Sequence, residues 1–167
     1  MGNIKNHLYQ AVITLGGKGT RLSSITSDIP KALWEIEGKH TFERTLSILA
    51  EQGINNFILL LDYKSEIFKI EALKLSIKYQ VKIKTHIENS PKGEAGSLID
   101  IEDDLDDIFL FIHGDIIFDI DLKIFFDFHI KNSSDITFIT HLTNHPKDSD
   151  CISESPSLKI HSYKLKN

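Results

Sequence analysis

The 167-residue chain has little of several residue types, and each shortage excludes a class of protein. Its only cysteine, Cys151, cannot form a disulfide within the chain, which fits a reducing compartment. No apolar run is long enough to span a bilayer, and residues 1–10 lack the apolar stretch of a signal peptide. We therefore expect a soluble, cytoplasmic protein with no membrane partner.

Positive charge is also scarce. The chain has 19 Lys and Arg against 24 Asp and Glu, which gives a formal net charge of -5. Proteins that bind nucleic acid usually carry a basic face, so we expect no nucleic-acid partner. A small phosphorylated ligand needs only a local cluster of cations and is not excluded. The length and a hydrophobic content of 41% suit one folded domain over residues 1–167.

Apolar runs alternate with helical patterns along the chain. Runs rich in β-branched residues predict strands, and amphipathic segments between them predict helices, which is typical of an α/β fold with a mainly parallel sheet between helices. The predicted strands cover residues 9–15, 56–62, 81–88, 107–115 and 135–142, and residues 158–165 could add one more. The predicted helices cover residues 41–53, capped by Thr41, residues 65–80, with apolar positions from Ile67 to Ile77, and residues 121–133, with a short helix after the turn near residue 93.

Several polar features follow predicted strand ends. Ligands of parallel sheets bind outside the carboxyl ends of the strands. A glycine-rich loop begins after Leu15, while Glu88 and Asp115 end two later strands. We therefore expect these features at one edge of the sheet.

The glycine-rich loop does not match two common phosphate motifs. Lys18 is followed by Gly19 where a P-loop needs Ser or Thr, and Leu22 replaces the third glycine of a dinucleotide fingerprint. The residues instead suit a loop that wraps a nucleoside triphosphate. Its glycines let backbone N–H groups approach phosphate oxygens. The planar guanidinium of Arg21 can contact two phosphate oxygens at once. Lys31 adds the charge of its ammonium, and Pro30 stiffens the backbone before it.

The motifs resemble those of the sugar-phosphate nucleotidyltransferases over residues 8–150. They read Gly-Gly-Lys-Gly-Thr-Arg-Leu over residues 16–22, Pro30-Lys31, Gly-Glu-Ala-Gly over residues 93–96, and Gly114-Asp115. Residues 144–150, Asn-His-Pro-Lys-Asp-Ser-Asp, are similar to a stretch in the branch of mannose and heptose 1-phosphate guanylyltransferases.

This resemblance implies a Rossmann-like three-layer sandwich and a magnesium-dependent reaction. The partners would be a nucleoside triphosphate and a sugar 1-phosphate, the products a nucleotide sugar and pyrophosphate. Arg21 and Lys31 would be the catalytic residues. The nucleotide-binding residues would be Leu15, Gly16, Gly17, Gly19, Thr20, Glu88 and Gly93.

We expect two carboxylates to have different roles, one in metal binding and one in base recognition. Asp115 is a hard oxygen ligand at a strand end and is the expected Mg²⁺ ligand. The acceptor-only carboxylate of Glu88 complements the N1–H and N2–H₂ donors of guanine, which favours GTP. Gly93 would let the backbone pass close to the base or ribose. The acidic run over residues 100–107 is interpreted as a solvated loop.

Members of this family continue for several further strands and helices, so we expect the part that binds the sugar to be missing here. Three hypotheses follow: a transferase, a nucleotide-binding fragment without turnover, and an enzyme like the molybdopterin guanylyltransferases. The last group usually has Ser-x-Arg-Met in its loop, so Thr20-Arg21-Leu22 fits the sugar branch better. An oligomer is compatible with all three.

Overall fold

The computed structural model describes residues 9–15, 29–62, 64–88, 92–93, 95–145, 147 and 149–165. The chain divides into two compact units, Met1–Phe125 and Phe126–Asn167. The first unit contains the predicted ligand-binding edge, and the second contains a separate hairpin. The prediction of a single domain over residues 1–167 stays a prediction.

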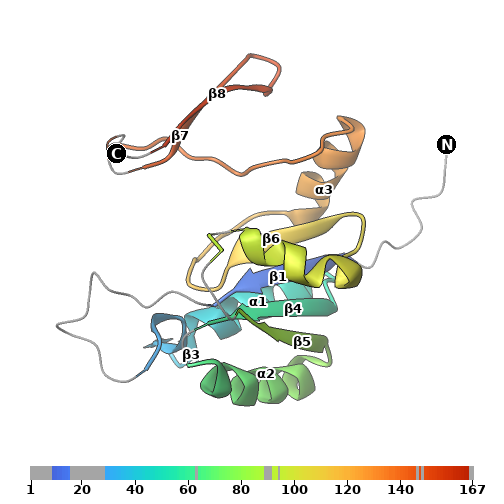
Figure 1. Ribbon diagram of the computed structural model, residues 1–167, viewed down its shortest axis with the longest axis vertical. Helices are drawn as coiled ribbons and strands as arrows, with labels where there is room; N and C mark the ends of the chain where they lie inside the picture. The colour runs from blue at the N-terminus through green and yellow to red at the C-terminus, as the bar shows by residue number, and fades with distance from the viewer. Residues whose placement is uncertain are drawn as a thin grey trace. The chain divides into compact units, whose positions relative to one another are not determined.

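The first unit is built on a four-stranded parallel sheet. Its strand order is β5-β4-β1-β6, which can be followed from bottom to top in Figure 1. These elements confirm four predicted strands and the mainly parallel sheet. Their bounds are β1 (Gln10–Thr14), β4 (Asn56–Leu61), β5 (Lys82–Ile87) and β6 (Phe109–His113).

Helical crossovers cover both faces of this sheet. The helices α1 (Thr41–Glu51) and α2 (Ser65–Tyr79) lead to β4 and β5, on one side of β1. The 3-10 helix η3 (Gly96–Asp104) leads to β6, on the other side. Right-handed crossovers that run in opposite directions lie on opposite faces. The structure therefore has the expected three layers, with η3 in front of the sheet and α1 behind it in Figure 1.

Alternation along the strands divides the core between the two faces. Val12, Ile58 and Leu60 form one buried cluster with Ile101 of η3. The neighbouring strand residues are also buried and point to the opposite face, where α1 and α2 meet through an edge-to-face contact of Phe42 and Phe68. The inner strands β1 and β4 are thus buried on both faces, as is typical of a parallel sheet covered by helices.

The helix α2 buries a different face from the one that its apolar pattern indicates. Phe68, Ala72 and Leu75 are buried, whereas Ile70 and Ile77 are 60% and 72% exposed. Successive side chains of a helix point about 100° apart around its axis. At this spacing Phe68, Ala72 and Leu75 share one face. The isoleucine stripe lies on the opposite side.

The N-terminus of α1 is capped by His40 and not by Thr41, which corrects the sequence prediction. The strands β2 (Glu35–Ile36) and β3 (Lys39–His40) form a hairpin whose two turn residues, Glu37 and Gly38, have φ values of 52° and 78°. Positive φ at both positions is the mark of a tight hairpin turn. The hairpin delivers His40, whose Nδ1 accepts a 3.0 Å hydrogen bond from the Glu43 backbone N–H. Thr41 is already helical and buried.

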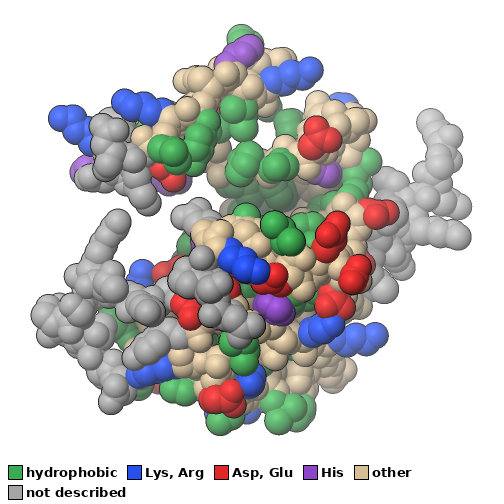
Figure 2. All heavy atoms as spheres, viewed as in Figure 1, with side chains coloured by type: hydrophobic (Ala, Val, Ile, Leu, Met, Phe, Trp, Pro, Cys, Tyr) green, Lys and Arg blue, Asp and Glu red, His purple; other side chains and the backbone are tan. Residues whose placement is uncertain are grey.

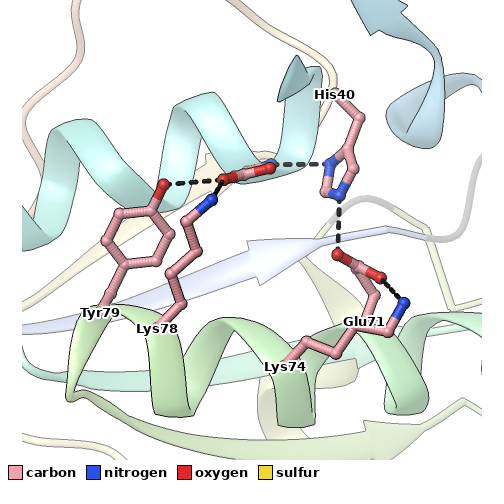
Figure 3. A network of polar contacts seen from close by, with 6 residues as sticks. His40, Glu71, Lys74, Lys78 and Tyr79 are labelled. Carbon is pink, nitrogen blue, oxygen red and sulfur yellow. Dashed lines mark hydrogen bonds and ion pairs between the residues drawn. The ribbon is translucent and has the colours of Figure 1, made fainter. Parts of the chain in front are cut away.

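Glu43 joins α1 to α2 through Lys78 and Tyr79, which Figure 3 labels at the end of α2. Its carboxylate Oε1 accepts hydrogen bonds from Lys78 Nζ at 2.6 Å and from the Tyr79 hydroxyl at 2.8 Å. Burial raises the pKa of Glu43, but these two hydrogen bonds outweigh it, so the pKa lies below its ordinary value of 4.5. A buried carboxylate is therefore held in its charged form.

A second carboxylate extends this network. Glu71 Oε1 lies 3.1 Å from His40 Nε2, and Glu71 Oε2 accepts a hydrogen bond from Lys74 Nζ at 2.9 Å (Figure 3). Because His40 Nδ1 accepts from the helix N-terminus, its Nε2 carries the proton that is donated to Glu71. One imidazole thus caps α1 and ties it to α2.

We expect Glu43→Gln to lower the free energy of unfolding at pH 7 by about 1–2 kcal/mol, because a charged acceptor is lost while the ammonium of Lys78 remains exposed to solvent. A carboxylate with a lowered pKa in the folded state stabilises above its ordinary pKa, and this contribution disappears as the pH falls through the folded value. Urea unfolding at pH 7 and pH 3 should therefore show a difference between variant and wild type that shrinks in acid.

Glu66→Gln is the matched control, since Glu66 pairs with Lys69 on the exposed side of α2. It should change stability little at either pH. An equal loss for both variants at pH 7, or a Glu43→Gln effect that does not depend on pH, would contradict this account.

The second unit lacks one predicted strand. Residues 135–142 form no strand, and Ile136 and Leu142 are 69% and 99% exposed. A strand exists through pairing with a neighbour, and no segment in the described part of the chain pairs with this one. An antiparallel hairpin is formed instead by β7 (Cys151–Glu154) and β8 (Ile160–Lys164), which confirms the strand considered over residues 158–165.

The helix α3 (Leu122–Lys131) crosses the boundary between the two units and confirms the predicted helix. Asp121 caps it, because its Oδ1 accepts a 3.0 Å hydrogen bond from the Ile124 N–H. Over the described ranges, the helices are all too short or too polar to cross a membrane.

Candidate active site

The carboxyl ends of β1 and β6 form the centre of the candidate site. The chain leaves β1 towards β4 on one side, while β6 is added on the other. Such a reversal opens a crevice where ligands of open α/β sheets bind. The Leu15 N–H donates to Leu60 O at 2.9 Å, and the Gly114 N–H donates to Thr14 O at 3.0 Å. Backbone pairing therefore continues up to Leu15, the residue before the glycine-rich loop.

Gly114 lets this edge close tightly. A Cβ atom at residue 114 would lie 2.3 Å from Leu15 Cδ2 and 3.1 Å from Ile13 Cγ2. Any larger residue here would have to displace the side chains of Leu15 and Ile13. Beyond it, the buried Thr45 hydroxyl donates to Ile116 O at 3.1 Å. The backbone on both sides of Asp115 is thus fixed.

Lys31 reaches the same place from the far end of the glycine-rich loop. It begins the short 3-10 helix η2 (Lys31–Leu33), and the Leu33 N–H donates to Pro30 O at 2.9 Å. Pro30 is buried, whereas Lys31 is exposed. A buried proline with a fixed φ anchors the turn and leaves the lysine side chain free to extend from it.

The structure brings Lys31 and Asp115 together although they lie 84 residues apart. Lys31 Nζ is 3.2 Å from Asp115 Oδ2, and the two side chains are 48% and 42% exposed. An ion pair this exposed contributes at most about 1 kcal/mol to stability. Either residue can therefore be replaced without unfolding the protein. The pair offers a cation for phosphate beside a hard oxygen ligand for a divalent cation.

The donor set around Asp115 fits magnesium bound together with a triphosphate. In the described part of the chain, no three His, Cys, Asp or Glu side chains gather into a metal cage. Mg²⁺ does not require one, because it is usually held by one or two carboxylates and by substrate phosphates. Asp115, exposed and next to the ammonium of Lys31, would supply such a carboxylate.

Glu88 lies at the same edge of the sheet, directly after its outer strand β5, and Gly93 follows five residues later. The Glu88 N–H donates to Leu61 O at 2.8 Å, so Glu88 directly follows β5. The strand β4 lies between β5 and β1, so the axes of β5 and β1 are about 10 Å apart. Gly93 has a φ of +83°, and nothing lies within 4 Å of a Cβ atom there. Conformation, not crowding, accounts for glycine at this turn.

Sequence reasoning missed Asp100. The acidic run was predicted to be a solvated loop, but residues 100–104 belong to η3, and Figure 2 shows acidic side chains over this helix. Asp100 contacts Lys92 Nζ at 2.5 Å and His86 Nε2 at 3.6 Å. Ile101, buried within the acidic run, was the signal that could have indicated a helix.

The other predicted loop residues, Gly16, Gly17, Gly19, Thr20 and Arg21, lie outside the described residues. Leu15, which precedes them, is described. Its side chain is buried against Gly114, the residue before Asp115.

Comparison with known proteins supports the resemblance. The family model described as "Nucleotidyl transferase" matches residues 10–155. The chain is 39% identical over 118 residues to D-glycero-alpha-D-manno-heptose 1-phosphate guanylyltransferase of Campylobacter jejuni, a match that covers 68% of this chain and 51% of that protein. It is 32% identical over 152 residues to mannose-1-phosphate guanylyltransferase of Mycobacterium tuberculosis, covering 87% of this chain and 41% of that protein. The chain thus spans about half the length of these relatives.

A solved structure shows the same architecture. HddC from Yersinia pseudotuberculosis, solved as a complex with GMP-PN, is 27% identical and superposes with a TM-score of 0.72. The superposition covers 95% of this chain and 69% of that one. Both the family model and this superposition extend across the sheet and the candidate site. The chain therefore belongs to the nucleotidyl transferase family.

Proposed function

We propose that this chain transfers a guanylyl group from GTP to a sugar 1-phosphate. The observation that carries the proposal is the Lys31–Asp115 pair at the carboxyl ends of β1 and β6. In this pair an ammonium that would bind phosphate lies beside a carboxylate that would bind Mg²⁺, at the edge where open α/β sheets bind their ligands. The names of the relatives, which are sugar 1-phosphate guanylyltransferases, support the sugar acceptor over molybdopterin.

The proposed reaction needs no nucleophilic side chain. A phosphate oxygen of the sugar 1-phosphate attacks the α-phosphorus of GTP and forms the new P–O bond. The bond from the α-phosphorus to the bridging oxygen breaks, and pyrophosphate leaves with the electron pair. Catalysis of this kind rests on positioning and charge stabilisation. Lys31, with Arg21, would hold the phosphates, and Asp115 would hold Mg²⁺, which offsets negative charge on the phosphates when bound.

The preference for guanine rests on Glu88. Its strand lies about 10 Å from β1, which leaves room for the ribose and base of a nucleotide whose phosphates lie at the glycine-rich loop. One carboxylate oxygen of Glu88 accepts the Lys92 N–H at 2.8 Å. A carboxylate has about four acceptor sites, so sites remain for the two donors of guanine.

Pyrophosphate release tests the proposal. The chain is incubated with Mg²⁺, each of four nucleoside triphosphates, and mannose or heptose 1-phosphates. We expect release with GTP and a sugar 1-phosphate and much less with UTP. Because the chain spans about half the length of its relatives, nucleotide binding without turnover is the second candidate. Calorimetric binding of GTP without any release of pyrophosphate would establish that second function and contradict the first.

Glu88→Gln should reduce the preference for GTP over UTP by about tenfold, because an amide can present either a donor or an acceptor to the base. Calorimetric titration with both nucleotides in the presence of Mg²⁺ measures this preference. Glu102→Gln, an exposed glutamate of η3, is the control and should leave it unchanged. A wild-type protein that prefers UTP would contradict the role of Glu88 and the choice of GTP together.

A further inference from the structure

Three segments of the chain converge on the carboxylate of Asp100. Lys92, in the turn after β5, places its Nζ 2.5 Å from Asp100 Oδ1. His86, within β5, places its Nε2 3.6 Å from Asp100 Oδ2. Asp100 itself lies in η3. A single side chain therefore links the strand, the turn that follows it and the helix after that turn.

This link continues to the candidate base-recognition residue. The Lys92 backbone N–H donates to Glu88 Oε1 at 2.8 Å, while the Lys92 side chain is held by Asp100. Gly93, which follows Lys92, has a positive φ, a conformation that glycine adopts at no steric cost. The position of the Lys92 N–H, and with it the orientation of the Glu88 carboxylate, therefore depends on where the Lys92 side chain is held.

We propose that Asp100 is a positioning residue for base recognition, because its contact with Lys92 fixes the turn that orients Glu88. The inference rests on the proposed function, since it assigns Glu88 to the base. An ordered turn lowers the entropy that is lost when the nucleotide binds. Asp100 would thus increase affinity and selectivity without touching the nucleotide.

The surroundings of Asp100 favour this role over that of an ordinary surface ion pair. The side chains of Asp100 and Lys92 are 27% and 39% exposed, so solvent screens them less than a fully exposed pair. The hydrogen bond from Lys92 is the main cause that lowers the pKa of Asp100, which keeps the carboxylate charged.

The same helix offers a matched control. Asp104 lies 2.5 Å from Lys84 of β5, so this pair also joins η3 to β5. Its position is at the opposite end of the strands, because the Asp104 backbone oxygen accepts a hydrogen bond from Gln10, the first residue of β1. Asp104→Asn therefore removes a similar ion pair without affecting the turn.

Hydrogen exchange measures the anchoring without any nucleotide. In the whole chain, Asp100→Asn and Lys92→Met should increase amide exchange of residues 88–96 by about fivefold or more. Asp104→Asn should leave this segment unchanged, and Lys92→Arg, which retains the charge, should restore most of the protection. Thermal midpoints confirm that each variant is folded. Equal exchange of residues 88–96 in wild type and Asp100→Asn would overturn the inference.

Nucleotide titration then tests the consequence for recognition. We expect Asp100→Asn to weaken GTP binding about five- to tenfold and to lower the preference over UTP, whereas Asp104→Asn changes neither. Faster exchange with unchanged GTP affinity would overturn the role of Asp100 in recognition. A wild-type protein that binds no nucleotide would refute the proposed function and this role, while hydrogen exchange would still decide whether Asp100 holds the turn.

Discussion

Asp115→Asn is expected to lower the magnesium-dependent rate of guanylyl transfer by roughly 1,000-fold while the protein stays folded. The substitution keeps the shape of the side chain but removes the negative charge, and a neutral amide oxygen is a much weaker Mg²⁺ ligand. The backbone around residue 115 remains held by Gly114 and Thr45. The loss would therefore come from the missing charge and not from a displaced strand.

A magnesium titration of pyrophosphate release measures this effect. Asp104→Asn is the control, because Asp104 also pairs with a lysine and has a similar exposed fraction, 38% against 42% for Asp115. It should retain the wild-type rate. If Asp115→Asn gave the wild-type magnesium dependence, the metal-binding role of Asp115 would be wrong. The Lys31–Asp115 pair would then no longer support the proposed function.

Lys31→Met should lower kcat/KM for GTP by about 100-fold, the scale expected for one lost charge contact to a transferring phosphoryl group. Methionine retains much of the aliphatic stem of lysine but cannot contact phosphate. Since the ion pair with Asp115 is exposed, we expect a change in thermal midpoint that corresponds to less than about 1 kcal/mol. Steady-state kinetics and thermal unfolding of the same preparation separate the two effects.

Lys84→Met provides the comparison, because Lys84 forms an exposed ion pair with Asp104 far from Lys31. Its kcat/KM should match that of the wild type. The double variant Lys31→Met/Asp115→Asn should lose less than the product of the two single effects, because both residues act on the same phosphates. Multiplicative losses would argue that the two residues act independently.

Sequence patterns predicted the inner strands β1 and β4 well because these strands are buried on both faces, whereas the edge strand β5, whose lysines are exposed, was predicted from its alternating pattern. Near-continuous apolar runs such as residues 56–61 are the direct result of that burial. The same reasoning was wrong for residues 135–142, whose apolar residues are exposed and whose backbone has no strand partner in the described ranges. It also missed the hairpin before α1, because strands of two residues are too short to show alternation.

The candidate site was predictable only where a motif marks it. Lys31 was identified from the Pro-Lys motif at the far end of the glycine-rich loop and Asp115 from the Gly-Asp motif at a strand end, and the fold brings the two side chains together. Asp100 has no such motif. Its partners lie 8 and 14 residues earlier in the chain, and their meeting depends on how η3 packs against β5. Contacts of this kind are set by tertiary packing, which a single sequence does not display.

The Lys31–Asp115 pair also has a consequence for what the resting protein attracts. Its two opposite charges cancel, so these residues present no net charge to solvent. A free phosphate would have to displace the carboxylate from the ammonium, and a free divalent cation would have to displace the ammonium from the carboxylate. A metal–triphosphate complex gives each charge a new counter-ion in the same event. Under the proposed function, the pair would therefore favour the complex over the separate ions, by no more than the roughly 1 kcal/mol that so exposed an ion pair contributes.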